Sequence, residues 1–212
     1  MQTSAPPDVR RAGAAALAAG VLLFASVAAE LVHPVQERDG TVAEPATFVL
    51  YAMCWVIGSL ALVAAIHGMR LSEPADGLRR PRVYVFGRRS SLAGAALLLA
   101  WGVVALVTAI STGKPLEASF VLFGLGLLLS MIGNVVLGLS LRRSAFLGHS
   151  WALLVVAGAG ALVAVTVFVD PWHDVGMFTF DAAWAALGVR LIAAAKGAAG
   201  TPTTPPHVQQ VG

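Results

Sequence analysis

Six apolar stretches, each long enough to cross a membrane, alternate with polar connections along the chain. They cover residues 12–31, 46–69, 92–110, 118–141, 151–169 and 177–195. Runs of about 20 apolar residues match the roughly 30 Å thickness of the hydrocarbon layer. Because backbone groups in lipid must be hydrogen-bonded within their own segment, each stretch is predicted to be a helix. The pattern predicts an all-α integral membrane protein with six transmembrane helices.

Composition agrees with this prediction and leaves little room for a soluble domain. The 212 residues are 58% hydrophobic and 12% charged, whereas charged residues supply about a quarter of a typical soluble domain. The stretches are apolar on all sides, unlike the one-sided stripe of a soluble helix. Residues 1–11 and 196–212 flank the bundle and are predicted to be flexible cytoplasmic tails.

The positions of the basic residues predict how the chain is threaded. In the six-span arrangement, every Lys and Arg except Arg38 and Lys114 falls on one side. The positive-inside rule makes that side, with both termini, cytoplasmic. We therefore expect a multi-pass protein of the bacterial inner membrane. One alternative stays open: Arg10, Arg11, the apolar run and the small residues 26–29 also resemble a cleavable signal peptide, which would leave five spans.

The connection at residues 70–91 is the longest and the most basic. Arginines beside a membrane gain roughly 1 kcal/mol each from anionic lipid headgroups. The residues expected to make these contacts are Arg79, Arg80, Arg82, Arg88 and Arg89. A docking surface for a cytoplasmic protein partner is the alternative. Nucleic acid is not an expected partner, because the basic charge follows the membrane topology.

Short similarities between spans suggest an internal repeat. Residues 46–51 (ATFVLY) resemble residues 118–123 (ASFVLF), and residues 177–181 are a looser match. A repeat of this kind would build the bundle from three in-out-in hairpins. Chance similarity is the alternative in a sequence so rich in Ala, Leu and Val.

Acidic and histidine residues gather at the predicted outer ends of two spans. The pairs Glu30/His33 and Asp170/His173 each have i, i+3 spacing, which places both members of a pair on one helix face. Two such pairs on facing helices could hold a metal, and nitrogen and oxygen ligands without thiolate favour zinc or iron. Asp181 is expected one turn inside the last span, facing protein, water or a cation. Polar helix ends with no cofactor at all are the simpler alternative.

A stripe of small and polar residues follows the fourth span at a spacing of four. Its members are Gly126, Ser130, Asn134 and Gly138. Small residues let helices approach closely, and an amide or hydroxyl can bond across the interface. The stripe is therefore predicted to form a helix contact, with the lining of a substrate cavity as the alternative.

Function is constrained mainly by what the spans lack. No charged residue or histidine lies near the middle of any span, which disfavours ion-coupled transport. Cys54, Trp55, Trp101 and Trp184 are interpreted as packing residues. We expect a non-catalytic membrane protein that binds a protein partner, a second copy, a lipid or a small molecule within the bundle. The alternatives are a metal or redox site at the outer cluster and a facilitative transporter lined by the Asn134 stripe.

Overall fold

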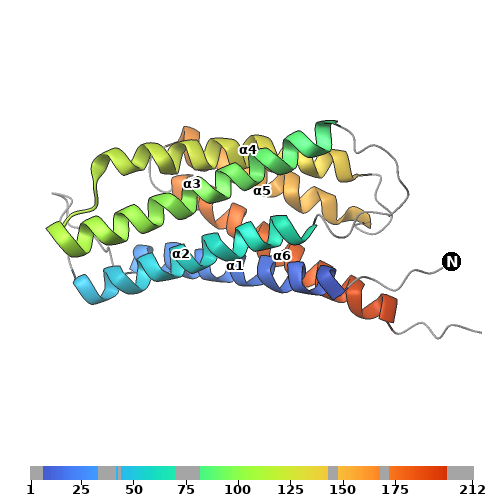
Figure 1. The fold of residues 1–212 in the computed structure, drawn as a ribbon, viewed down its shortest axis with the longest axis horizontal. Helices are drawn as coiled ribbons and strands as arrows, with labels where there is room; N and C mark the ends of the chain where they lie inside the picture. The colour runs from blue at the N-terminus through green and yellow to red at the C-terminus, as the bar shows by residue number, and fades with distance from the viewer. Residues whose placement is uncertain are drawn as a thin grey trace, which may run out of the picture.

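The computed structural model describes residues 7–32, 42, 44–69, 82–142, 148–167 and 172–199. These residues form six α-helices and two short 3-10 helices, and no strand occurs among them (Figure 1). The α-helices are α1 (Pro7–Val32), α2 (Pro45–Gly68), α3 (Arg82–Thr112), α4 (Phe120–Leu141), α5 (Trp151–Thr166) and α6 (Trp172–Ala199). The 3-10 helices η2 (Glu117–Ser119) and η3 (Gly148–Ser150) lead into α4 and α5. The predicted all-α fold is confirmed.

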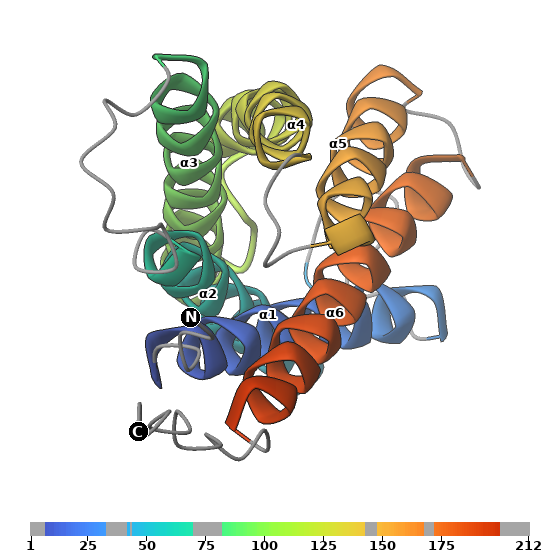
Figure 2. The same ribbon diagram turned by 90° about the vertical axis from the view of Figure 1, so that its right-hand side faces the viewer.

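The six helices close into a ring in the order of the chain. Each helix contacts the next one, and α6 contacts α1. Successive helices run in opposite directions along the ring axis, as Figure 1 shows from the side and Figure 2 from one end. The beginning of α1 and the end of α6 therefore lie at the same end of the bundle.

Most of the helices have the length and the surface of membrane spans. Five of them are long and apolar enough to cross a membrane, and α5 is a shorter apolar helix of 16 residues. Large apolar side chains such as Leu50, Ile110 and Val121 are exposed on the outside of the ring. Outward-facing apolar side chains are expected where lipid is the solvent. The structure is that of an all-α membrane protein.

Glycines allow neighbouring helices to approach closely. A Cβ added at Gly160 on α5 would lie 2.6 Å from the backbone nitrogen of Phe180 on α6. A Cβ added at Gly94 on α3 would lie 2.6 Å from the backbone nitrogen of Ser130 on α4. No side chain fits at such distances, so these contacts need glycine. Close packing through small residues is the usual means of association where lipid removes the hydrophobic driving force.

Helix α3 begins at Arg82, ahead of the predicted span at residues 92–110. Its first turns pack on the end of α4: Tyr84 is buried, and a Cβ at Gly87 would lie 2.7 Å from the backbone nitrogen of Leu137. The arginine-rich sequence had suggested a loop up to Ser91. The buried face that the arginines leave between them explains why the segment is helical instead.

Candidate functional site

A cavity that could hold a ligand lies at the end of the ring where α1 and α3 end and α2, α4 and α6 begin. Its volume is about 510 Å³. This end is opposite to the one that holds the beginning of α1 and the end of α6 (Figure 1). We call this cavity the aromatic pocket. It is lined by Val27, Glu30, Leu31, Phe48, Tyr51, Ala52, Trp55, Trp101, Gly102, Ala105, Pro115, Phe120, Phe123, His173, Asp174 and Met177.

Three aromatic rings from three helices form the wall of the aromatic pocket on the α2–α4 side. The rings of Trp55 and Trp101 meet edge to face, with centroids 5.0 Å apart and an interplanar angle of 83°. The Phe123 ring lies 4.8 Å from Trp101 and 5.7 Å from Trp55. Such distances are those of favourable aromatic pairs. The three rings thus support one another in the wall of the cavity.

Neighbouring groups fix the orientation of the Trp55 indole. Its N–H donates a hydrogen bond to the backbone carbonyl of Leu98 on α3 at 3.3 Å. The ring lies against Gly102, where an added Cβ would be 2.7 Å from Trp55 Cδ1. Trp55 is 2% exposed. A glycine and a carbonyl on α3 therefore hold the indole in one position.

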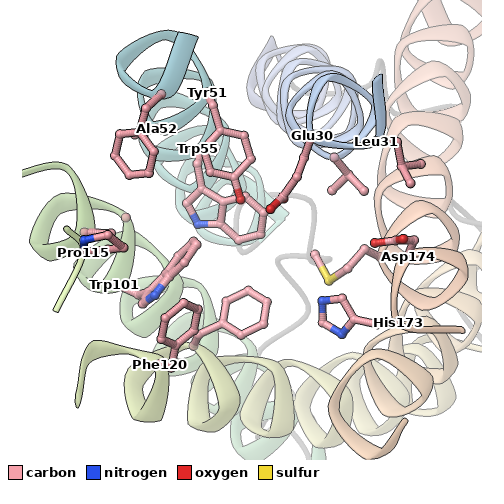
Figure 3. Close-up of a pocket in the computed structure, with 16 residues that line it drawn as sticks. Glu30, Leu31, Tyr51, Ala52, Trp55, Trp101, Pro115, Phe120, His173 and Asp174 are labelled. Atoms are coloured by element: carbon pink, nitrogen blue, oxygen red, sulfur yellow. The ribbon is translucent and has the colours of Figure 1, made fainter. Parts of the chain in front are cut away.

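The opposite side of the aromatic pocket is polar. Glu30 comes from the end of α1, and His173 and Asp174 come from the first turn of α6, as Figure 3 shows. The hydroxyl of Tyr51 is hydrogen-bonded to the Glu30 carboxylate. The described lining residues include two carboxylates and no Lys or Arg. The pocket wall therefore carries net negative charge when both acids are ionised.

His173 joins the polar side to the neighbouring helix. Its Nδ1 lies 2.8 Å from the backbone carbonyl of Ala164 on α5, which requires this nitrogen to carry the proton and to donate. The imidazole also lies 6.0 Å from the Phe123 ring. The hydrogen bond from His173 satisfies the Ala164 carbonyl, which lies in the last turn of α5. Carbonyl groups in the last turn of a helix lack partners within the helix.

The connection between α3 and α4 covers one edge of the aromatic pocket. The Thr108 hydroxyl donates to the Val104 carbonyl at 2.8 Å and accepts from the Leu116 N–H at 3.0 Å. The chain turns at Gly113, whose φ of 74° lies in the left-handed region that favours glycine. These features fold the connection back onto α3 and place Pro115 at the pocket.

The predicted outer cluster is only partly described. Glu30 and His173 line the same pocket, while His33 and Asp170 lie outside the described residues. Among the residues that the structure describes, no three His, Cys, Asp or Glu side chains are grouped closely enough to hold a metal ion. A metal site that includes His33 and Asp170 stays a prediction.

Asp181 lies one helical turn beyond Met177, farther into the bundle. Its side chain is 0% exposed. Neither carboxylate oxygen has a hydrogen-bond partner among the described residues. Asp181 does not line the aromatic pocket, but it is close enough to act electrostatically on Tyr51. A buried carboxylate without a partner is costly and is uncommon outside functional regions of membrane proteins.

The predicted stripe on α4 divides between two neighbouring helices. A Cβ at Gly126 would lie 2.9 Å from the Leu98 side chain on α3, whereas a Cβ at Gly138 would lie 2.9 Å from the Trp151 carbonyl of α5. Residues four apart are offset by about 40° on a helix with 3.6 residues per turn, so the stripe turns around α4. Neither the aromatic pocket nor a second groove between α1 and α2 is lined by Gly126, Ser130, Asn134 or Gly138.

The described basic residues lie almost entirely in the half of the bundle away from the aromatic pocket. Lys114, beside the pocket end of α4, is the exception among them. Arg79 and Arg80 of the predicted lipid-contact set lie outside the described residues. The described basic residues in that far half are Arg10, Arg11, Arg82, Arg88, Arg89, Arg142, Arg190 and Lys196.

The aromatic residues are what sequence reasoning missed at this site. Trp55 and Trp101 were interpreted as packing residues, and Tyr51 and Phe123 were not assigned a role. A signal was present, since aromatic residues occur at matching depths of several spans. Phe48, Tyr51 and Trp55 have helical spacing on one span, and Phe120 and Phe123 have it on another.

Comparisons with known proteins supply no further guide: no family model, curated protein or solved structure matches the chain.

Proposed function

We propose that this multi-pass membrane protein binds a small, largely apolar molecule in the aromatic pocket, without a chemical step. The observation that carries the proposal is the cavity of about 510 Å³ between five helices. Ligand pockets typically have volumes of roughly 300 to 1,000 Å³ and combine apolar walls with a few polar groups. The Trp55, Trp101 and Phe123 rings supply the apolar wall, and Glu30 and Asp174 supply polar groups.

The contacts around the aromatic pocket support binding rather than simple imperfect packing. Trp55 is held by the Leu98 carbonyl and by Gly102, and Glu30 is hydrogen-bonded to Tyr51. A wall whose side chains are already fixed loses little conformational entropy when a ligand binds.

The orientation of the protein follows from its basic half as part of the same proposal. Arg and Lys side chains are favoured on the cytoplasmic side of spans, and arginines there gain from anionic lipid headgroups. Arg82, Arg88 and Arg89 in the first turns of α3 are in position for such contacts. The aromatic pocket then opens on the outer side of the inner membrane, so that its ligand arrives from outside the cytoplasm.

The proposal is tested by filling the cavity. Ala105 lines the aromatic pocket and is 4% exposed, whereas Val107 on the same helix is 59% exposed. Ala105→Phe places a ring in the cavity, and Val107→Phe places the same ring against lipid. Ala52→Leu fills the cavity from α2 with a smaller side chain, in case Ala105→Phe overpacks the bundle.

Small molecules that co-purify with each variant are measured by mass spectrometry after extraction. We expect a compound in stoichiometric amount with the wild type and with Val107→Phe, and its loss from Ala105→Phe and Ala52→Leu. Equal retention by all four folded proteins would contradict binding in the aromatic pocket.

A further inference from the structure

We propose that the ligand of the aromatic pocket is a small organic cation, a quaternary ammonium group or a protonated amine that carries apolar substituents. This inference rests on the proposed function and specifies its ligand class. It is carried by the arrangement of the pocket, in which aromatic rings and carboxylates face each other across one cavity (Figure 3).

The aromatic wall has the composition that binds organic cations. The face of an indole or phenyl ring is negative, so a cation within about 6 Å of the ring centre is attracted to it, most strongly by Trp. Trp55, Trp101 and Phe123 pack against one another, with all three pairs of ring centroids between 4.8 and 5.7 Å apart, and all three line the cavity. A quaternary ammonium group could contact several of these rings together.

The carboxylates supply the matching charge. Glu30 and Asp174 lie on the opposite side of the cavity from Trp101 and Phe120 in Figure 3. The Tyr51 hydroxyl is hydrogen-bonded to Glu30 and so fixes the carboxylate at the cavity. A cation between the two walls would contact aromatic faces on one side and negative charge on the other.

An anionic ligand fits these residues poorly. Among the residues that the structure describes, no Lys or Arg lines the aromatic pocket. Lys114 precedes the lining residue Pro115 in the chain but is not itself part of the lining.

The test compares two probes that differ in charge and hardly in shape. Benzyltrimethylammonium carries one positive charge, and in its isostere 2,2-dimethylpropylbenzene a carbon atom replaces the nitrogen. Binding is measured by equilibrium dialysis against the full chain in phosphatidylglycerol nanodiscs, with empty nanodiscs as the blank for partitioning. Dissociation constants refer to the free probe concentration in the dialysate.

We expect the cation to bind at least about tenfold more tightly than the isostere, since desolvated cation–π contacts and a counter-charge both favour it. Glu30→Gln and Asp174→Asn should each weaken binding of the cation several-fold and leave the isostere unchanged. Glu30→Asp, which keeps the charge, should retain most of the affinity. Asp8→Asn removes a carboxylate at the opposite end of the bundle and serves as the matched control.

The outcomes separate the two proposals. Equal binding of both probes, lost in Ala105→Phe, would overturn the cation and retain the pocket. Binding of neither probe, or binding that Ala105→Phe leaves intact, would overturn both. Each variant is first compared with the wild type by size-exclusion profile and thermal unfolding, so that a lost fold is not counted as lost binding.

The same cation could belong to a free molecule or to a lipid headgroup. The dialysis is therefore repeated in phosphatidylcholine nanodiscs, whose headgroup carries the trimethylammonium group. A several-fold weaker affinity for benzyltrimethylammonium in these discs would identify the headgroup as a competitor for the site. An unchanged affinity would assign the site to a free cation.

Discussion

The Ser91 hydroxyl on α3 donates a hydrogen bond to the side-chain oxygen of Asn134 on α4 at 2.9 Å. Both side chains are almost fully buried, and the Asn134 amide nitrogen has no hydrogen-bond partner among the described residues. The contact joins two helices that also approach closely at Gly133, where an added Cβ would overlap the backbone of Ser91. The polar bond and the glycine contact together fix how α3 lies on α4.

A double-mutant cycle should detect this bond. We expect a coupling free energy of about 0.6 kcal/mol between Ser91→Ala and Asn134→Ala, the average found for interhelical hydrogen bonds in membranes. Unfolding in a denaturing detergent gives the four free energies. Ser140 is the control, because its hydroxyl donates only to the Leu137 carbonyl of its own helix. If the coupling free energy between Ser91 and Asn134 is no larger than that between Ser140 and Asn134, the hydrogen bond contributes nothing to stability.

Two glycines on α4 should respond to the same substitution in opposite ways. Gly133→Ala forces a Cβ into the Ser91 backbone, and overpacking of this kind costs about 1–3 kcal/mol. A Cβ at Gly124 meets nothing within 4 Å, so Gly124→Ala should stabilise by up to about 1 kcal/mol through the higher helix propensity of Ala. Thermal unfolding of both variants checks this. A tolerated Gly133→Ala would mean that α3 and α4 lie farther apart.

The all-α membrane fold could be predicted from sequence because it depends on hydropathy alone. Apolar runs of sufficient length have one stable backbone conformation in lipid, and all six predicted spans contain a described helix. The helix partners could not be predicted, since apolar spans carry little information on which faces meet. Asn134 was predicted to lie in a helix contact, with a cavity lining as the alternative, and nothing in the sequence identified Ser91 as its hydrogen-bond partner.

The candidate site was predictable only in its polar part. Glu30 and His173 were singled out because charged residues are rare in such a chain, and both line the aromatic pocket. Trp55 and Trp101 were interpreted as packing residues, and each is indeed almost fully buried. Whether a buried ring also borders a cavity depends on which neighbours are small. Gly102 and Ala105 create that space, and small residues are too frequent in this sequence to be informative.

Asp181 should limit the stability of the protein. Its carboxylate is fully buried without a partner among the described residues, and such a group costs a few kcal/mol in a membrane protein. Asp181→Asn should therefore raise the thermal unfolding midpoint of the purified protein. Asp174→Asn, at a half-buried position in the first turn of α6, should change it little. A lower midpoint for Asp181→Asn would show that a bound cation or water stabilises the carboxylate.

The proposed orientation predicts which end of α4 reagents reach from outside the cell. Ala118 precedes α4 at the pocket end, and Arg142 follows it at the basic end, and both are exposed. Cys54 is the only cysteine in the chain, so Cys54→Ala gives a background without thiols. In this background, Ala118→Cys should react with a membrane-impermeant maleimide in intact cells. Arg142→Cys should react only after permeabilisation.

Both outcomes follow from charge, because basic residues are retained on the cytoplasmic side of spans. The two cysteines flank one helix, so an orientation with the aromatic pocket facing the cytoplasm would exchange their labelling. Labelling of both in intact cells would instead indicate a mixed orientation. Either result would remove the argument that the ligand of the aromatic pocket arrives from outside, while the geometry of Trp55, Trp101 and Glu30 would still define where it binds.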